Sequence, residues 1–343
     1  MENELDTYGN KTPNFDVEYY GADFTIDLLV KRMDDGDFII PGFQRKYVWR
    51  EDEASHFIES LVLGLPTPSI FLAKDKFSQC FLVIDGQQRL KTLQYFYQGL
   101  FPSGKKFRLK GVVPDLNGLT YIDFPPAARR RLDNSIIHCI IISESYDSSA
   151  IFYLFERLNT TGTPLNAQEI RNAIYHGPFS DLLQRLSENG SWKHIYGKEE
   201  SRMADQELIL RFLAFYYNLE QYRGNMTAFL NEFMLRNRTL DDNISAREIE
   251  DLFLTTVRFL EDCIGPKVFH CRRIFNKTFF DSVTYVTARN VRSESDCDRF
   301  RMFLDRLSHD DRFWSMAQHS SSHTGIVFER FQYVQHLYEN PGP

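Results

Sequence analysis

One segment limits the fold of this chain more than any other. It is a run of five apolar residues, Cys80–Ile84, which passes directly into Asp85-Gly86. A strand that is apolar at every position is typical of a sheet covered on both faces, because a sheet with one exposed face alternates apolar and polar residues. We therefore expect helices on both faces of a sheet in this part of the chain.

The residues around this strand predict a mixed α and β module followed by helices. Apolar spacing predicts early helices over 24–35, 52–63 and 87–98, and short strands over 38–40, 69–73 and 136–142. Later helices are predicted over 151–158, 206–217, 226–235, 246–263, 279–289 and 328–337. A chain of 343 residues exceeds what one core normally serves. We predict an α+β chain with an α/β domain at 1–145 and an all-helical domain at 146–343.

The charge balance excludes a protein that coats nucleic acid without specificity. The formal net charge is -7, whereas such proteins are usually basic. One stretch between Gly104 and Arg131 does carry seven Lys or Arg against two Asp. It is the predicted nucleic-acid surface, and a solvated basic face is the alternative. Its cations are Lys105, Lys106, Arg108, Lys110, Arg129, Arg130 and Arg131.

The cysteines and the apolar runs indicate the compartment. Five cysteines are scattered without a Cys-x-x-Cys pair, which favours reduced thiols over a disulfide framework. No apolar run approaches the roughly 18 residues of a membrane span. The polar N-terminus has no signal-peptide core. The sequence therefore predicts a cytoplasmic protein with no membrane partner.

The first candidate site is the turn Asp85-Gly86-Gln87-Gln88-Arg89. The N–H groups in the first turn of a helix have no intrahelical acceptors, and the helix dipole adds positive charge there, so the turn can bind an anion. Gly86 lets a phosphate approach the backbone, and Arg89 offers a planar pair of donors. Asp85 is expected to cap the helix, to bind Mg²⁺ or to orient an arginine.

Two further segments carry polar groups of the same kind. Gln44-Arg45-Lys46-Tyr47 follows a predicted strand, and Tyr47 could stack on a base while the cations bind phosphates. Trp49, two residues later, is predicted to pack against the helix that begins at Asp52. The third segment is a helix–loop–helix corner. It carries Asn159, Thr160, Glu169, Arg171 and Asn172, and an ordinary capped corner is the alternative.

Together these segments resemble a known family. The stretches IPGFQRKYVW, SLVLGLPTPSIFL, VIDGQQRLKTL and FERLNTTGTPLNAQEIRNA, in that order, are similar to the N-terminal domain of the GmrSD type IV restriction endonucleases. The resemblance runs from about Phe24 to Phe179. It implies a fold related to the ParB and sulfiredoxin nucleotide-binding module. It also implies binding of a nucleoside triphosphate (NTP) with Mg²⁺, and in relatives its hydrolysis in defence against phage DNA.

The resemblance assigns roles by position. The family's Gln-Arg motif falls on Gln44 and Arg45, its Asp-Gly-Gln-Gln-Arg motif falls on 85–89, and its Asn and Glu-x-Arg-Asn positions fall on Asn159, Glu169, Arg171 and Asn172. Together with the neighbouring polar and aromatic residues described above, the predicted nucleotide-binding set is Gln44, Arg45, Lys46, Tyr47, Gly86, Gln87, Gln88, Arg89, Asn159, Thr160, Arg171 and Asn172. Asp85, Arg89 and Glu169 are the predicted catalytic residues for NTP hydrolysis. Asp85 is the predicted metal ligand, and Asp85 or Glu169 is expected to bind the metal or to orient the water.

The predicted function is an NTP-binding module of an anti-phage restriction system, which senses DNA or gates a partner nuclease. Many family members carry a nuclease domain of the HNH type, whose chemistry needs a His base and metal-binding His or Asn. The last part of this chain reads as helices and a Ser/His loop, a pattern that does not predict such a nuclease domain. Two alternatives stay open, a DNA-binding regulator without turnover and a nuclease that uses the Gln-Arg and Asp-Gly-Gln-Gln-Arg pocket. Expected partners are an NTP, DNA, a separate nuclease or defence subunit, and a second copy of the chain.

Overall fold

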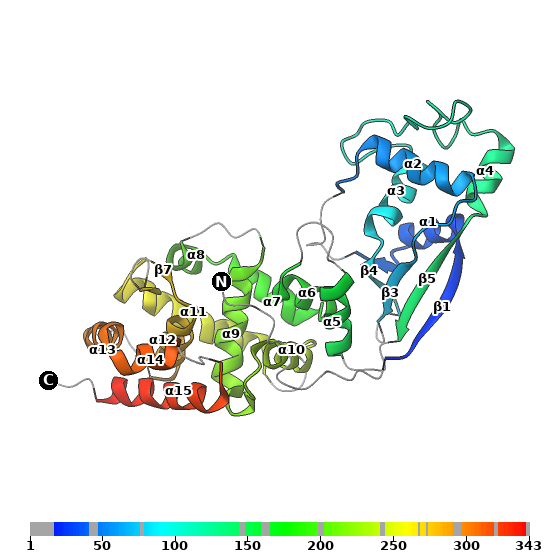
Figure 1. The fold of residues 1–343 in the computed structure, drawn as a ribbon. Coiled ribbons are helices and arrows are strands. Elements are labelled where there is room, and N and C mark those ends of the chain that lie inside the picture. The colour runs from blue at the N-terminus through cyan, green and yellow to red at the C-terminus, as the bar shows by residue number, and fades with distance from the viewer. Residues whose placement is uncertain are drawn as a thin grey trace. The chain divides into compact units, whose positions relative to one another are not determined.

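The computed structural model shows two compact units, which meet in the sequence at Ile174 and Tyr175 (Figure 1). The N-terminal unit contains a sheet and helices, and the C-terminal unit is almost entirely helical, so the predicted α+β class is confirmed. The structure describes residues 17–40, 47–75, 79–143, 148–158, 165–197, 202–240, 244–266, 268–271, 274–290, 296–318 and 322–340.

A five-stranded sheet forms the centre of the N-terminal unit. Its strands, in the order β1-β5-β3-β4-β2, are β1 (Tyr19–Thr25), β5 (Ile136–Ser143), β3 (Ile70–Lys74), β4 (Phe81–Asp85) and β2 (Phe38–Ile39). β2 runs parallel to β4, and β3 runs parallel to β5, while the pairs β1–β5 and β3–β4 are antiparallel. Because β2 and β4 are parallel, both strands end at the same edge of the sheet.

Six helices accompany this sheet in the described part of the unit. They are α1 (Ile26–Asp34), α2 (Glu51–Val62), α3 (Gln87–Gln98), α4 (Pro126–Asp133), α5 (Ser148–Leu158) and α6 (Ala167–Ile174). α3 packs against α1 and α2, whereas α5 packs against β4 and α6. The first four residues of β4 are buried, as the continuous apolar run predicted.

Aromatic side chains join α3 to the long segment that follows it. Phe96 of α3 is fully buried and makes edge contacts with the rings of Phe107, Tyr121 and Phe124. Phe101 stacks on Phe107 with ring centroids 4.0 Å apart. These contacts fix the segment between α3 and α4, which has little secondary structure of its own.

The C-terminal unit consists of helices and one short hairpin. Its elements are α7 (Pro178–Ser187), α8 (Gly190–Tyr196), α9 (Ala204–Asn218), η1 (Leu219–Gln221), α10 (Met226–Arg236), α11 (Ala246–Cys263), β6 (His270–Cys271), β7 (Ile274–Phe275), α12 (Lys277–Asn290), α13 (Cys297–His309), α14 (Asp311–Gln318) and α15 (Thr324–Glu339). The hairpin β6–β7 is a departure from the all-helical prediction. Arg211 of α9 and Asp281 of α12 form a buried ion pair in this unit.

Three sequence expectations are wrong. Phe24 lies in β1 rather than in the first helix, because it pairs with Ile137 across the sheet. The helix predicted to begin at Asp52 begins at Glu51 with Arg50 as its N-cap, and Glu53 accepts a hydrogen bond from the backbone N–H of Arg50 at 2.8 Å. Cys263 and Cys297 form a disulfide, with their Cα atoms 5.4 Å apart, instead of two free thiols. No described helix has both the length and the apolar character to cross a membrane.

Candidate functional site

The turn between β4 and α3 places a glycine, Gly86, at the edge of the sheet where β4 ends. Gly86 is the N-cap of α3 and has φ +101°, a conformation that residues with a Cβ rarely adopt. A Cβ at this position would lie 2.7 Å from Cγ1 of Ile70 on the neighbouring strand. Because Gly86 has no side chain, the N-cap residue cannot accept hydrogen bonds from the first-turn N–H groups of α3 through a side chain. Binding of an anion at this turn stays a prediction, which rests on the first-turn N–H groups.

Arg89 lies in the first turn of α3 and faces inward. One terminal nitrogen donates to the carbonyl oxygens of Pro68 and Ser69, the latter at 3.0 Å. The other donates to the Asp85 carboxylate at 2.8 Å. The side chain is only 11% exposed. Burial lowers the pKa of Arg89, and the neighbouring carboxylate of Asp85 opposes that shift.

Of the three roles expected for Asp85, the structure shows one, the orientation of an arginine. Its Oδ2 accepts the hydrogen bond from Arg89, and its side chain is 43% exposed, so the carboxylate is open to solvent. Arg89 also connects the turn to the carbonyls that precede β3. This arginine therefore holds the turn together, in addition to any contact with a ligand.

Gln88 links the turn to the second motif segment. Its Oε1 accepts a hydrogen bond from the backbone N–H of Val48 at 3.0 Å. One residue earlier, the hydroxyl of Tyr47 bonds Oγ1 of Thr92 at 2.9 Å, one helical turn beyond Gln88. Burial raises the pKa of Tyr47 to about 12. Two segments that are 40 residues apart in the sequence are thus joined directly.

The corner that carries Glu169 and Arg171 has clear structural bonds. Asn166 Oδ1 accepts from the backbone N–H of Glu169 at 2.8 Å, and Glu169 Oε2 accepts from that of Asn166 at 2.7 Å. This reciprocal pair caps α6. Arg171 is 2% exposed and donates to Oε1 of Gln168 at 3.0 Å. Its guanidinium also lies 6.0 Å from the ring centre of Phe152.

The structure brings together only part of the predicted nucleotide-binding set. Tyr47, Gly86, Gln88 and Arg89 meet at the sheet edge, and Gln87 is buried at the start of α3. Glu169, Arg171 and Asn172 lie on α6, which joins this region through α5. Five predicted residues lie outside the described part of the chain: Gln44, Arg45, Lys46, Asn159 and Thr160. Their assignment stays a prediction.

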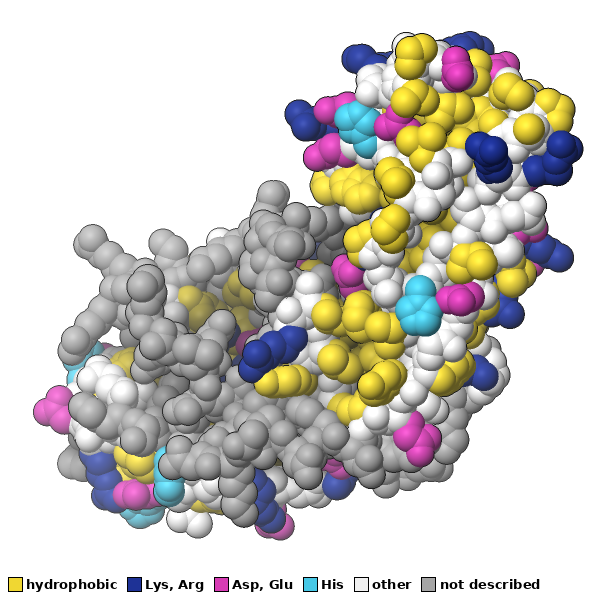
Figure 2. Space-filling view, turned by 45° about the vertical axis from the view of Figure 1, so that its right-hand side comes forward, with side chains coloured by type: hydrophobic (Ala, Val, Ile, Leu, Met, Phe, Trp, Pro, Cys, Tyr) yellow, Lys and Arg dark blue, Asp and Glu magenta, His cyan; other side chains and the backbone are white. Residues whose placement is uncertain are grey.

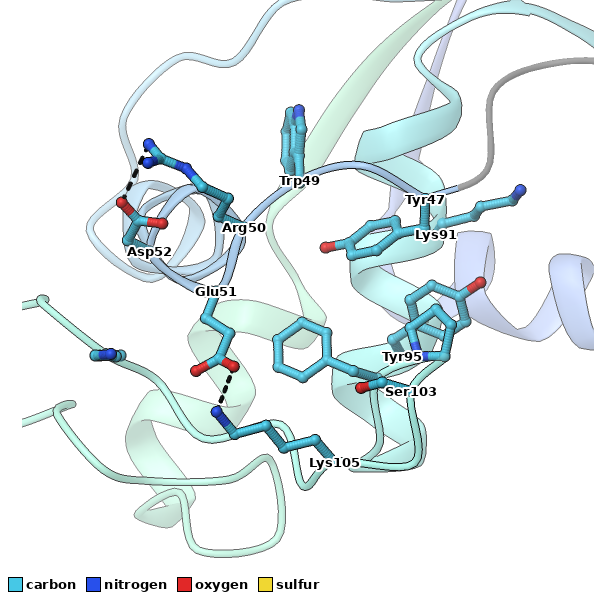
Figure 3. Close-up of a pocket in the computed structure, with 12 residues that line it drawn as sticks. Tyr47, Trp49, Arg50, Glu51, Asp52, Lys91, Tyr95, Ser103 and Lys105 are labelled. Atoms are coloured by element: carbon cyan, nitrogen blue, oxygen red, sulfur yellow. Dashed lines mark hydrogen bonds and ion pairs between the residues drawn. The ribbon is translucent and has the colours of Figure 1, made fainter.

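A pocket of about 990 Å³ lies beside the Tyr47 segment (Figure 3). Its aromatic lining is Tyr47, Trp49, Tyr95 and Phe101. Its charged lining is Arg50, Glu51, Asp52, Lys91, Lys105 and Lys110, and Pro102 and Ser103 complete it. Figure 3 shows the ring of Trp49 and the Glu51–Lys105 ion pair on opposite sides of this space. Sequence reasoning missed the pocket because its residues come from segments without a shared motif.

The predicted nucleic-acid surface is only partly available. Lys105 pairs with Glu51, and Arg108 lies 3.7 Å from Asp123. Arg129 donates to the carbonyl of Ile122 at 2.6 Å and packs over the ring of Tyr121. In the view of Figure 2, the end of the N-terminal unit that carries α2 and α4 shows Lys and Arg side chains scattered among hydrophobic ones. The remaining cations are exposed and form no ion pair with a described residue: Lys106, Lys110, Arg130 and Arg131.

No group of three His, Cys, Asp or Glu side chains among the described residues is arranged to hold a metal ion. A magnesium ion bound with a nucleotide takes most of its ligands from phosphates and water, and often only one or two from carboxylates. The carboxylate of Asp85 is exposed to solvent at the turn, so it could serve as the single carboxylate ligand of such an ion. Among the described residues, Asp85 is therefore the carboxylate that would hold an ion bound together with a nucleotide.

One known family matches the part of the chain that contains these residues. Residues 26–176 match the model described as GmrSD restriction endonuclease, N-terminal domain. The chain carries a GmrSD N-terminal domain. The match ends two residues beyond α6, so it includes the turn, the Tyr47 segment, the pocket and the capped corner. None of the curated proteins compared with the chain matches it. The family description connects the domain with restriction systems.

Proposed function

We propose that the GmrSD N-terminal domain binds a nucleoside triphosphate at the edge where β2 and β4 end. In this proposal it is the nucleotide-dependent component of a restriction system that acts on DNA with a nuclease. The hydrogen bond from Val48 to Gln88 carries the proposal, because it holds the segment after β2 against the helix that follows β4. Ligands of open α/β sheets commonly bind where the carboxyl ends of parallel strands meet.

The same hydrogen bond orients the Gln88 amide. Since Oε1 accepts from Val48, the Nε2 group is the part of the amide left to donate to a ligand. Beside it, Gly86 removes the Cβ that would keep a phosphate away from the first-turn N–H groups. Backbone donors, one oriented amide and a partly buried arginine together form a phosphate site.

Asp85 would hold a magnesium ion that enters with the triphosphate. The ion would neutralise phosphate charge beside the carboxylate, and Arg89 keeps that carboxylate in place. Glu169 has one oxygen in the cap of α6, so its contribution to the site is first to fix the corner.

Isothermal titration of each NTP, with and without Mg²⁺, tests the proposal. The sharpest variant is Gln88→Glu, which keeps an acceptor for Val48 but adds a negative charge beside the phosphates. At an effective dielectric near 40 and a separation of about 5 Å, this charge costs about 1–2 kcal/mol, or roughly tenfold in affinity. Gln184→Glu, an exposed position on α7, is the matched control and should bind like the wild type. A wild-type chain that gives no heat with any NTP would refute the proposal.

A further inference from the structure

The pocket beside the Tyr47 segment has more positive than negative side chains, whereas the chain as a whole is negatively charged. Four of its lining side chains are cationic and two are carboxylates, in a chain whose net charge is -7. Both carboxylates already have partners. Glu51 pairs with Lys105, and Asp52 lies 3.4 Å from Arg50. Lys91 and Lys110 are left without a carboxylate partner among the described residues.

The position of Lys91 makes this excess significant. It lies on α3, one turn beyond Gln87, and is half-buried. Burial lowers the pKa of Lys91, so the ammonium has lost part of its hydration without gaining an ion pair. A partly desolvated cation is stabilised when an anion binds beside it.

The aromatic wall of the same pocket offers a flat surface. Trp49 is half-buried, and its ring meets Phe57 at an angle of 70°, with the centroids 5.5 Å apart. A T-shaped contact covers at most one face of a ring, and Trp49 also lines the pocket, where its ring can meet a planar ligand. Phe101, by contrast, is stacked on Phe107 and 8% exposed, so it forms the floor.

Aromatic rings combined with lysines are the means by which proteins bind unstacked nucleotides, and this pocket is lined by Trp49 and by lysines without a carboxylate partner among the described residues. We propose that this pocket binds an unpaired nucleotide, with the base stacked on Trp49 and the phosphate paired with Lys91 or Lys110. The pocket volume of about 990 Å³ is at the upper end of the range of ligand sites, roughly 300–1,000 Å³. A paired base has both faces covered by its neighbours, so duplex DNA does not fit unless a base is extruded.

This site is separate from the proposed triphosphate site at the sheet edge and does not depend on it. Of the residues assigned to that edge, the pocket lining includes only Tyr47. The two proposals can therefore fail independently. Gln88→Glu should weaken NTP binding and leave binding of an unpaired nucleotide in the pocket unchanged.

Intrinsic fluorescence provides the first test. Trp49 is the one tryptophan of the N-terminal unit, and the others are Trp192 and Trp314. An oligothymidylate of twelve nucleotides or free thymidine monophosphate should quench the emission of the wild type. The same titration of Trp49→Phe should give no quenching. Quenching by the monophosphate identifies a free nucleotide as a ligand, and quenching by the oligonucleotide alone identifies a DNA strand. No quenching by either would overturn the proposal.

Fluorescence anisotropy of the labelled oligonucleotide provides the second test and uses exposed lysines, whose replacement leaves the core intact. Lys110→Gln should weaken binding roughly five-fold or more, as should Trp49→Ala. Lys106→Gln is the matched control, since Lys106 is also exposed but does not line the pocket. The same oligonucleotide annealed to its complement should bind more weakly than the single strand. Equal losses in the two lysine variants, or equal binding of the duplex, would overturn the proposal in favour of a general basic surface.

Discussion

Replacing Gly86 by Ala tests why the turn needs a residue without a side chain. Two costs add up. An L-residue at φ +101° costs about 1–2 kcal/mol. The new Cβ would lie 2.7 Å from Cγ1 and 3.1 Å from Cγ2 of Ile70, and overpacking of this kind costs about 1–3 kcal/mol. The sum is a loss of about 2–5 kcal/mol in the stability of the N-terminal unit.

Gly99→Ala is the matched control at the other end of the same helix. Gly99 has φ +76°, but a Cβ there would have no atom within 4 Å. Only the backbone cost of about 1–2 kcal/mol applies. The two variants should therefore differ by about 1–3 kcal/mol, the cost of the contact with Ile70.

Amide hydrogen exchange on peptides from β4 and α3 is the suitable assay, because it reports the opening free energy of this unit alone. Exchange in Gly86→Ala should be faster than in Gly99→Ala by a factor of roughly 5 to 150, when the difference of about 1–3 kcal/mol is converted. Equal exchange in the two variants would refute the claim that Ile70 closes the space over the turn.

Three further predictions concern stability. Cys263→Ser should lower the free energy of unfolding by about 3–4 kcal/mol, because the disulfide closes a segment with a sequence separation of 34. A melting temperature of the wild type that does not respond to reductant would contradict this prediction. Asp281→Ala should lower the free energy of unfolding in urea by about 3–5 kcal/mol, because it leaves the buried Arg211 without its carboxylate. Asp251→Ala removes the exposed pair with Arg247 and should change stability by less than about 1 kcal/mol. Similar losses in the two variants would contradict the role of the buried pair. Because burial raises the pKa of Tyr47 to about 12, its contribution to stability is present below pH 10 and is lost between pH 10 and 12. Tyr47→Phe should therefore lose less stability across that window, as measured by urea unfolding at each pH, and an unchanged pH dependence would contradict the burial.

The sequence predicted those parts of the fold that local rules determine. The apolar run before Asp85 and the glycine after it define β4, the turn and α3 without reference to the rest of the chain. The helix–loop–helix corner was predicted as well, and its cap of Asn166 and Glu169 corresponds to the alternative of an ordinary capped corner. Each of these features depends on neighbours in the sequence.

The parts that sequence reasoning missed depend on long-range contacts. Phe24 has helical spacing, but pairing with β5 places it in a strand. The inward position of Arg89 depends on the carbonyls of Pro68 and Ser69, which no motif indicates. The pairing of Cys263 with Cys297 cannot be deduced from an odd set of scattered cysteines.

Trp49 shows how an interpretation can be incomplete. It packs on Phe57, as the sequence predicted, yet it also lines the pocket. Whether a ring keeps a face toward open space depends on residues that are distant in the sequence, here Phe101 and Lys105. This long-range dependence also explains why Lys105 and Lys110 were assigned to a basic surface instead of to a pocket with Trp49.

The most direct test of the proposed function is hydrogen exchange at two first-turn amides of α3, those of Gln88 and Arg89, with and without NTP and Mg²⁺. The N–H groups in the first turn of a helix have no intrahelical acceptors, so a ligand that accepts their hydrogen bonds should slow their exchange. We predict that a saturating NTP slows exchange at these two residues by at least about tenfold, while amides at the C-terminal end of α3 do not change. Unchanged exchange at both residues would contradict a phosphate site at this turn.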